Sequence, residues 1–221
     1  MIFWGFIMQN GITFTKAEKY FYLRRIHSLL GLLPIGLFFL EHLYSNAISL
    51  QGPKAYNEMV EKLMAMPFLP IIEVSAIAIP LLFHIILGIV IYLSSKSNVL
   101  QYRHFNNWRY FLQRVTGLIG VIYIGFHVWE TRILSIINGQ HVSYERMQEI
   151  LSTPWMFWFY LVGAISLTFH FTNGLWTMGI TWGVTVNVRA QRISTVICGL
   201  LFLGLSAAWV QILLHLTGRI Y

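Results

Sequence analysis

The chain has 221 residues, of which 57% are hydrophobic and only 10% are charged. Soluble domains carry about 25% charged residues, so this composition excludes an ordinary soluble fold. The net charge of +7 does not indicate nucleic-acid binding, because such binding needs a basic face and the long apolar runs here place the charges on two sides of a membrane. The feature that needs explanation is a set of eight histidines in a chain whose eight acidic residues are all glutamates.

Hydropathy predicts an all-α integral membrane bundle of five transmembrane helices. Each predicted span has about 20 to 26 residues, which is enough to cross a bilayer with some tilt. The spans cover residues 26–46, 69–93, 110–129, 155–180 and 193–216. Residues 1–19 are expected to be an N-terminal extension without the features of a signal peptide, and residues 20–221 form the transmembrane domain. The single Cys198 excludes an internal disulfide and a cysteine-ligated metal cluster.

The basic residues predict the orientation, because lysine and arginine are enriched on the cytoplasmic side. Ten of them flank the spans on the side of the N-terminus and five on the other side, so we expect a cytoplasmic N-terminus and an external C-terminus. One glutamate brings the inner side to +9, and seven glutamates bring the outer side to −2. An inner face of this charge is suited either to anionic lipid or to a soluble partner. The inner set comprises Lys16, Lys19, Arg24, Arg25, Lys96, Arg103, Arg109, Arg114, Arg189 and Arg192.

Four histidines lie within the first four spans, one in each. They are His42, His84, His127 and His170, separated by 42, 43 and 43 residues. From the helical rise, His42 and His127 lie about 8–10 Å toward the outer side, and His84 and His170 lie about 3 Å toward the inner side. A lone buried histidine is usually a hydrogen-bonding residue, but two imidazoles facing each other at each of two levels are the ligand set of two b haems. Zinc would need three or four ligands in one cluster.

A further histidine, His27, lies at the start of the first predicted span and is therefore expected near the inner interface. Its partner there would be a haem propionate or a lipid headgroup. Anionic propionates attract hydrogen-bond donors, and the inner haem is expected to find them at the start of spans one and three. The candidate propionate partners are Arg24, Arg25, His27, Ser28, Gln113 and Arg114. For each arginine the alternative is ordinary anchoring at the membrane surface. His104, His141 and His215 are expected at the surface.

Four motifs resemble the Bacillus-type cytochrome b558 anchors of succinate:menaquinone oxidoreductases and the related fumarate reductases. They are RRIHSLLG at 24–31, QRVTG at 113–117, HVWETR at 127–132 and HFTNGLW at 170–176, and the resemblance runs from about Tyr20 to His215. It implies five helices in the bacterial cytoplasmic membrane and two haems b. It also implies that His42 and His127 ligate the outer haem, and His84 and His170 the inner one.

The resemblance also implies partners and a reaction. A flavoprotein and an iron–sulfur protein would bind on the cytoplasmic side, and electrons from succinate would pass through the haems to menaquinone. The subunit itself would hold no catalytic residue for succinate. Alternatives are a fumarate reductase anchor working in reverse, a quinone-reactive subunit of another respiratory enzyme, and a non-haem transporter whose histidines are relay or packing groups.

The resemblance further implies an outer quinone site with a glutamate in the loop leading to the second span. By position Glu61 matches best, ahead of Glu58 and Glu73. Related fumarate reductases carry a glutamate two residues before the fourth haem ligand, where this chain has Thr168. That departure favours the Bacillus-like arrangement.

Overall fold

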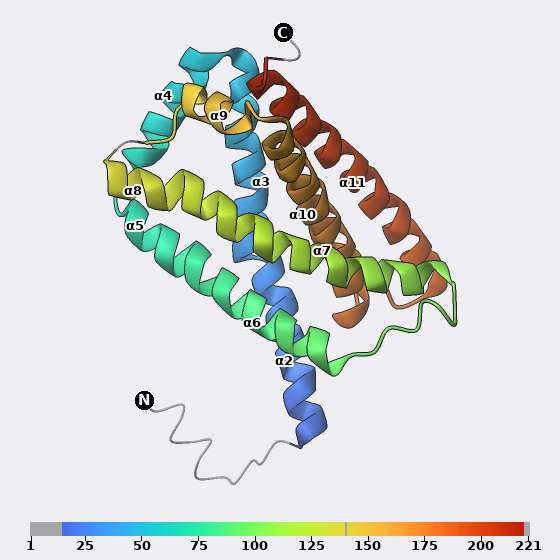
Figure 1. Cartoon of the computed structure of the whole chain (residues 1–221). Helices are drawn as coiled ribbons and strands as arrows, with labels where there is room; N and C mark the ends of the chain where they lie inside the picture. The colour runs from blue at the N-terminus through green and yellow to red at the C-terminus, as the bar shows by residue number, and fades with distance from the viewer. Residues whose placement is uncertain (1–14, 140, 219–221) are drawn as a thin grey trace, which may run out of the picture.

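The computed structural model describes residues 15–139 and 141–218, and all regular structure in them is helical (Figure 1). Five helical runs are long and apolar enough to cross a membrane, which confirms the predicted all-helical bundle. The runs are Ala17–Gln51, Leu69–Ser94, Phe105–Asn138, Pro154–Thr181 and Val188–Leu216. Each extends past the predicted span at one end or both.

The first crossing consists of α2 (Lys16–Leu32) and α3 (Pro34–Ala47). A capping box starts α2, because the Thr15 hydroxyl accepts from the Glu18 amide while the Glu18 carboxylate accepts from the Thr15 amide. The helix therefore begins inside the expected extension at residues 1–19, of which residues 1–14 lie outside the described part. Pro34 divides the crossing, since proline has no amide hydrogen to donate.

Short helices follow the first and third crossings at the same end of the bundle. After α3 come a 3₁₀ turn, η1 (Ile48–Gln51), and α4 (Pro53–Met64). Gly52 has φ +100°, which a residue with a Cβ rarely adopts, and Pro53 then starts α4. The Gly-Pro pair thus starts α4. The matching helix after the third crossing is α9 (Tyr144–Leu151).

The second and third crossings each contain a π-helical turn. The second is α5 (Leu69–Ile72), η2 (Glu73–Ala78) and α6 (Ile79–Ser94). The third is α7 (Phe105–Val128), η3 (Trp129–Ile133) and α8 (Leu134–Asn138). The fourth and fifth crossings are the single helices α10 (Pro154–Thr181) and α11 (Val188–Leu216).

Helix α10 packs against α7, α11 and α2, and α2 lies along α6. The start of α2 and the end of α11 lie at opposite ends of the bundle, and α4 and α9 lie at the end that α11 reaches (Figure 1). The most deeply buried cluster joins α4 and α9 to α10 and α11 at that end, with Leu151, Ile212 and Leu216 almost fully buried. Apolar side chains remain exposed along α6 and α11, as a lipid-facing surface requires. The side of the membrane on which each end lies stays a prediction.

Candidate functional site

The histidines predicted at the outer level face each other across the bundle. The ring centres of His42 on α3 and His127 on α7 lie 5.7 Å apart, with the ring planes at 71°. Aromatic side chains surround the pair. Between ring centres, Tyr123 stacks on His127 at 5.6 Å, Tyr160 lies 5.7 Å from His127, and Trp209 lies 6.1 Å from His42. This end of the bundle therefore holds two imidazoles in an apolar, aromatic setting.

The imidazole nitrogens of this outer pair have few fixed partners. The Asn46 side-chain amide donates to the His42 backbone carbonyl at 2.8 Å and lies 3.4 Å from His42 Nε2. His127 Nδ1 is buried and has no hydrogen-bond partner within the described ranges. A metal-ligating histidine normally has a partner for its second nitrogen, so the outer pair has a less complete supporting shell than the inner pair.

The histidines predicted at the inner level also come together. The ring centres of His84 on α6 and His170 on α10 lie 6.1 Å apart, with the planes at 87°. His84 Nδ1 lies 3.0 Å from the His27 carbonyl oxygen, and His170 Nδ1 lies 3.0 Å from the Gln113 carbonyl oxygen. A carbonyl can only accept, so both Nδ1 atoms carry the hydrogen and each neutral ring keeps its lone pair on Nε2.

The packing around these two inner rings leaves room for the imidazoles only because glycines lie beneath them. A Cβ on Gly31 would come within 2.6 Å of His84 Cε1, and a Cβ on Gly117 within 2.9 Å of His170 Cε1. Imidazole–metal bonds are about 2 Å long, so two imidazoles on opposite sides of one metal have ring centres roughly 6 Å apart. Both histidine pairs match that separation. The tautomers and the glycine contacts of the inner pair fit a bis-histidine haem, and the outer pair fits one by its ring separation alone.

His27 has a different setting from the one expected at the interface. Its ring stacks on His84 with centres 3.9 Å apart and planes at 14°, and its Nδ1 lies 3.1 Å from the His84 carbonyl oxygen. It therefore lies at the level of His84. A stack this close has no space for a metal between the rings, so His170 and not His27 faces His84 as a second ligand.

Two of the arginines predicted on the inner side donate hydrogen bonds to the ends of neighbouring helices. Arg25 donates to the Thr181 carbonyl at the end of α10, and Arg114 donates to the Tyr92 and Ser95 carbonyls at the end of α6. Positive charge at helix C-termini is favourable. The Nε atoms of Arg25 and Arg114 are nevertheless buried without a partner in the part of the chain that is described, so each keeps one donor for an anion.

The other candidate propionate partners are more fully occupied. Arg24 donates to the Tyr20 hydroxyl, and the Ser28 hydroxyl donates to the Arg25 carbonyl while accepting from the Trp182 indole. The Gln113 side chain donates to the His170 carbonyl at 2.9 Å. Gln113 thus braces the fourth histidine, a contact that sequence position alone does not indicate.

Arg109, which was counted with the basic inner face, is buried instead. Its side chain is 8% exposed, its Nε donates to Asn173 Oδ1 at 2.7 Å, and its Nη1 donates to Thr195 Oγ1 at 3.1 Å. Its guanidinium also lies 3.7 Å from the ring centre of Trp176. Asn173 in turn donates to Gln113 Oε1, so a polar chain runs from this charge to the residue that braces His170. The basic face that was predicted on the inner side is correspondingly smaller by one charge.

The outer carboxylates separate into paired and exposed groups. Glu73 in η2 forms an ion pair with Arg132 in η3, with an N···O distance of 2.5 Å and both side chains half-buried. Arg132 Nη1 also lies 3.9 Å from the Met64 sulfur. Glu61 lies exposed in the last turn of α4. Glu58, also exposed, lies 4.0 Å from Lys54.

The three histidines expected at the surface differ. His104 and His141 are exposed as expected. His215 is half-buried, and its Nδ1 lies 3.3 Å from the Tyr144 hydroxyl, so the end of α11 is tied to α9. The expectation for His215 was wrong because the short helix α9 covers that end of the bundle.

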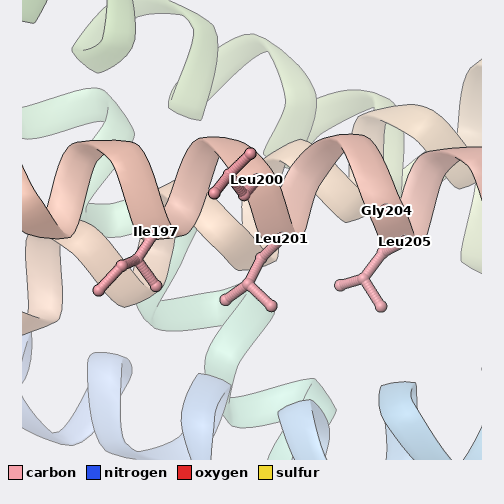
Figure 2. A pocket seen from close by; sticks show the side chains of 5 residues that line it. All are labelled: Ile197, Leu200, Leu201, Gly204 and Leu205. Carbon is pink, nitrogen blue, oxygen red and sulfur yellow. The ribbon is translucent and has the colours of Figure 1, made fainter.

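One hollow lies away from the histidines, on the surface of α11. It has a volume of about 360 Å³ and is lined by Ile197, Leu200, Leu201, Gly204 and Leu205. Figure 2 shows Ile197, Leu201 and Leu205 pointing from α11 toward the first crossing. The four leucine and isoleucine side chains carry no polar atom and Gly204 has no side chain, so the hollow suits a hydrocarbon chain and offers no side-chain group for catalysis.

Comparisons with known proteins identify the family of the chain. Residues 92–209 match the family described as "Succinate dehydrogenase/Fumarate reductase transmembrane subunit". Over 191 residues, the chain is 44% identical to the succinate dehydrogenase cytochrome b558 subunit of Bacillus subtilis (strain 168). The match covers 86% of this chain and 94% of that protein.

Proposed function

The chain belongs to the family of succinate dehydrogenase and fumarate reductase transmembrane subunits, and we propose that it is a dihaem cytochrome b anchor of succinate dehydrogenase. In this role it anchors a flavoprotein and an iron–sulfur subunit on the cytoplasmic side of a bacterial membrane. Two b haems held by the four histidines would carry electrons from the iron–sulfur subunit toward menaquinone. The same scaffold serves fumarate reduction in the reverse direction.

The observation that carries the proposal is the meeting of four histidines as two facing pairs. His42 with His127 and His84 with His170 have the ring separations that one metal between two imidazoles requires. Two b haems bound there would supply one-electron relays at two depths of the bundle. The unpaired Nε atoms of Arg25 and Arg114 are donors for the propionates of the inner haem.

The pairing makes a spectroscopic prediction. We expect His42→Ala and His127→Ala each to remove the same haem, and His84→Ala and His170→Ala each to remove the other. Reduced-minus-oxidised spectra with a redox titration of the purified complex measure this, and His104→Ala, in an exposed loop, is the matched control. Loss of one haem from His42→Ala and of the other from His127→Ala refutes the pairing, and a wild-type complex without b haem refutes the function.

For the quinone, we propose Glu61 as the proton donor and acceptor at the outer end. The Glu61 carboxylate is exposed in the last turn of α4, at the end of the bundle that is predicted to face outward. Removing a general base costs about 10²–10⁴-fold in rate. We therefore expect Glu61→Gln to lower quinone reduction by at least about 10²-fold while succinate oxidation with a soluble dye is unchanged. Glu58→Gln, one turn earlier, is the control, and an active Glu61→Gln variant excludes Glu61 from this role.

A further inference from the structure

Where α2 packs against α6, each helix donates a hydrogen bond to the backbone of the other. His27 Nδ1 donates to the His84 carbonyl at 3.1 Å, and His84 Nδ1 donates to the His27 carbonyl at 3.0 Å. Each ring also lies over a glycine of the other helix. A Cβ on Gly31 would come 2.6 Å from His84 Cε1, and a Cβ on Gly88 would come 3.1 Å from His27 Cε1.

The contact between α7 and α10 has the same two reciprocal hydrogen bonds. His170 Nδ1 donates to the Gln113 carbonyl at 3.0 Å, and Gln113 Nε2 donates to the His170 carbonyl at 2.9 Å. A Cβ on Gly117 would come 2.9 Å from His170 Cε1, and a Cβ on Gly174 would come 3.6 Å from Gln113 Nε2. In both helix pairs, each glycine lies four residues after the residue whose side chain donates to the other helix.

The two helix pairs, α2 with α6 and α7 with α10, also agree in sequence spacing. His27 and His84 are 57 residues apart, and so are Gln113 and His170. The first half of each unit is an outward-running helix followed by a short helix at the same end, α4 in one and α9 in the other. The first four membrane-spanning segments are therefore built as two copies of one ligand-presenting unit, and α11 lies outside the repeat. The facing pair of His84 and His170 joins equivalent members of the two copies, and His42 and His127 correspond to within one residue.

This repeat gives His27 a role. We propose that His27 is a positioning residue for His84, holding in the first unit the place that Gln113 holds in the second. Its ring lies against the His84 ring, and its Nδ1 donates to the His84 carbonyl. This hydrogen bond holds α6 against α2 and thereby sets the orientation of His84, as the Gln113 side chain does for His170. The inference rests on the proposed function, because it takes His84 and His170 as ligands of the inner haem.

The repeat also predicts which substitution is tolerated at position 27. A glutamine at 27 can donate to the His84 carbonyl as Gln113 donates to the His170 carbonyl, whereas a leucine leaves that contact unmade. Residues that support a ligand typically contribute 10–100-fold to metal affinity. We expect His27→Leu to weaken retention of the inner haem about 10–100-fold, and His27→Gln to retain it.

The experiment uses the whole complex and two readouts. Low-spin ferric haems with two imidazole ligands give electron paramagnetic resonance signals that depend on the angle between the ring planes. In His27→Leu the signal of the inner haem should shift and that of the outer haem should not, whereas His27→Gln should keep both signals. Gln113→Leu should shift the same signal as His27→Leu, and Gln113→His should keep it, which tests the second unit even where His27→Leu fails to assemble.

The outcomes separate the alternatives. Loss of the inner haem in His27→Gln as well as in His27→Leu makes His27 itself a ligand and overturns the proposal. A changed midpoint potential with unchanged signals in His27→Leu makes it a propionate partner and also overturns it. A wild-type complex with no haem signal removes the proposed function itself, so the two failures are distinct.

Discussion

Arg109 is a buried guanidinium held between three membrane helices by hydrogen bonds rather than by a carboxylate. It bonds Asn173 and Thr195 and stacks on Trp176, which uses the planar fork of arginine in a way that lysine cannot. Loss of these bonds leaves the Asn173 carbonyl oxygen without its charged donor. A buried polar group left unpaired costs about 1–3 kcal/mol.

We therefore predict that Arg109→Lys lowers the free energy of unfolding by about 1–3 kcal/mol, because the fork and the stack are both lost. Thermal unfolding of the purified protein in detergent measures the change. Arg103→Lys, a conservative change at an exposed position in the preceding loop, is the control and should leave the midpoint unchanged. Equal midpoints for the two variants contradict the role given to Arg109.

The sequence was sufficient to select the four paired histidines, because one intramembrane histidine per helix at regular spacing is a one-dimensional signal. It was not sufficient for the residues around them. The contacts of Gln113 with His170 and of His27 with His84 depend on which helices cross and at what height. Arg109 was misplaced for the same reason: its position at the start of a span does not say that α10 and α11 cover it.

At the scale of helices, the apolar runs predicted how many crossings exist but not where the helices end. Hydropathy marks the hydrocarbon core, whereas helix ends are set by caps such as Thr15 with Glu18 and by breaks such as Pro34. The short amphipathic helices α4 and α9 have too few apolar residues in a row to resemble a span. They meet through Asn57, whose Oδ1 accepts from the Tyr144 amide at 2.8 Å and whose Nδ2 donates to the Glu145 carboxylate at 3.3 Å.

This joint between α4 and α9 predicts a pH dependence. The backbone amide of Glu145, the Ser143 hydroxyl and the Asn57 amide, in that order, hold the pKa of Glu145 below its usual range. The folded-state pKa is the lower one, so the contribution to stability is present above the ordinary glutamate pKa of about 4.3 and is lost as the pH falls through the folded-state value.

Hydrogen exchange of α9 measures this effect. After correction for intrinsic exchange rates, we expect protection of α9 to decrease below about pH 4.3 in the wild type and to show no such decrease in Glu145→Gln. Helix α11 contains no acidic residue and serves as the internal reference in the same sample. Equal pH dependence of α9 protection in the wild type and in Glu145→Gln contradicts the assignment.

At the scale of the whole molecule, the two ends of the bundle have different chemistry. The end at which α2 starts carries exposed basic side chains, and the end with α4 and α9 carries most of the glutamates. Two arginines of the basic end, Arg25 and Arg114, are committed to helix termini, which leaves the exposed basic residues for contact with a soluble partner. The exposed set comprises Lys19, Arg24, Lys96, Arg103, Arg189 and Arg192.

The docking of the soluble subunits should therefore depend on these exposed charges. We predict that Lys96→Glu together with Arg103→Glu, in the loop between α6 and α7, lowers co-purification of the iron–sulfur and flavoprotein subunits. The difference from the wild type should decrease with added salt, because exposed charges are screened over about 8–10 Å near physiological ionic strength and over shorter distances as the salt concentration rises. Lys62→Glu reverses an exposed charge at the opposite end and should leave co-purification unchanged. If Lys62→Glu releases the partners and the loop variant does not, the predicted orientation of the bundle is reversed and the soluble subunits bind at the α4–α9 end.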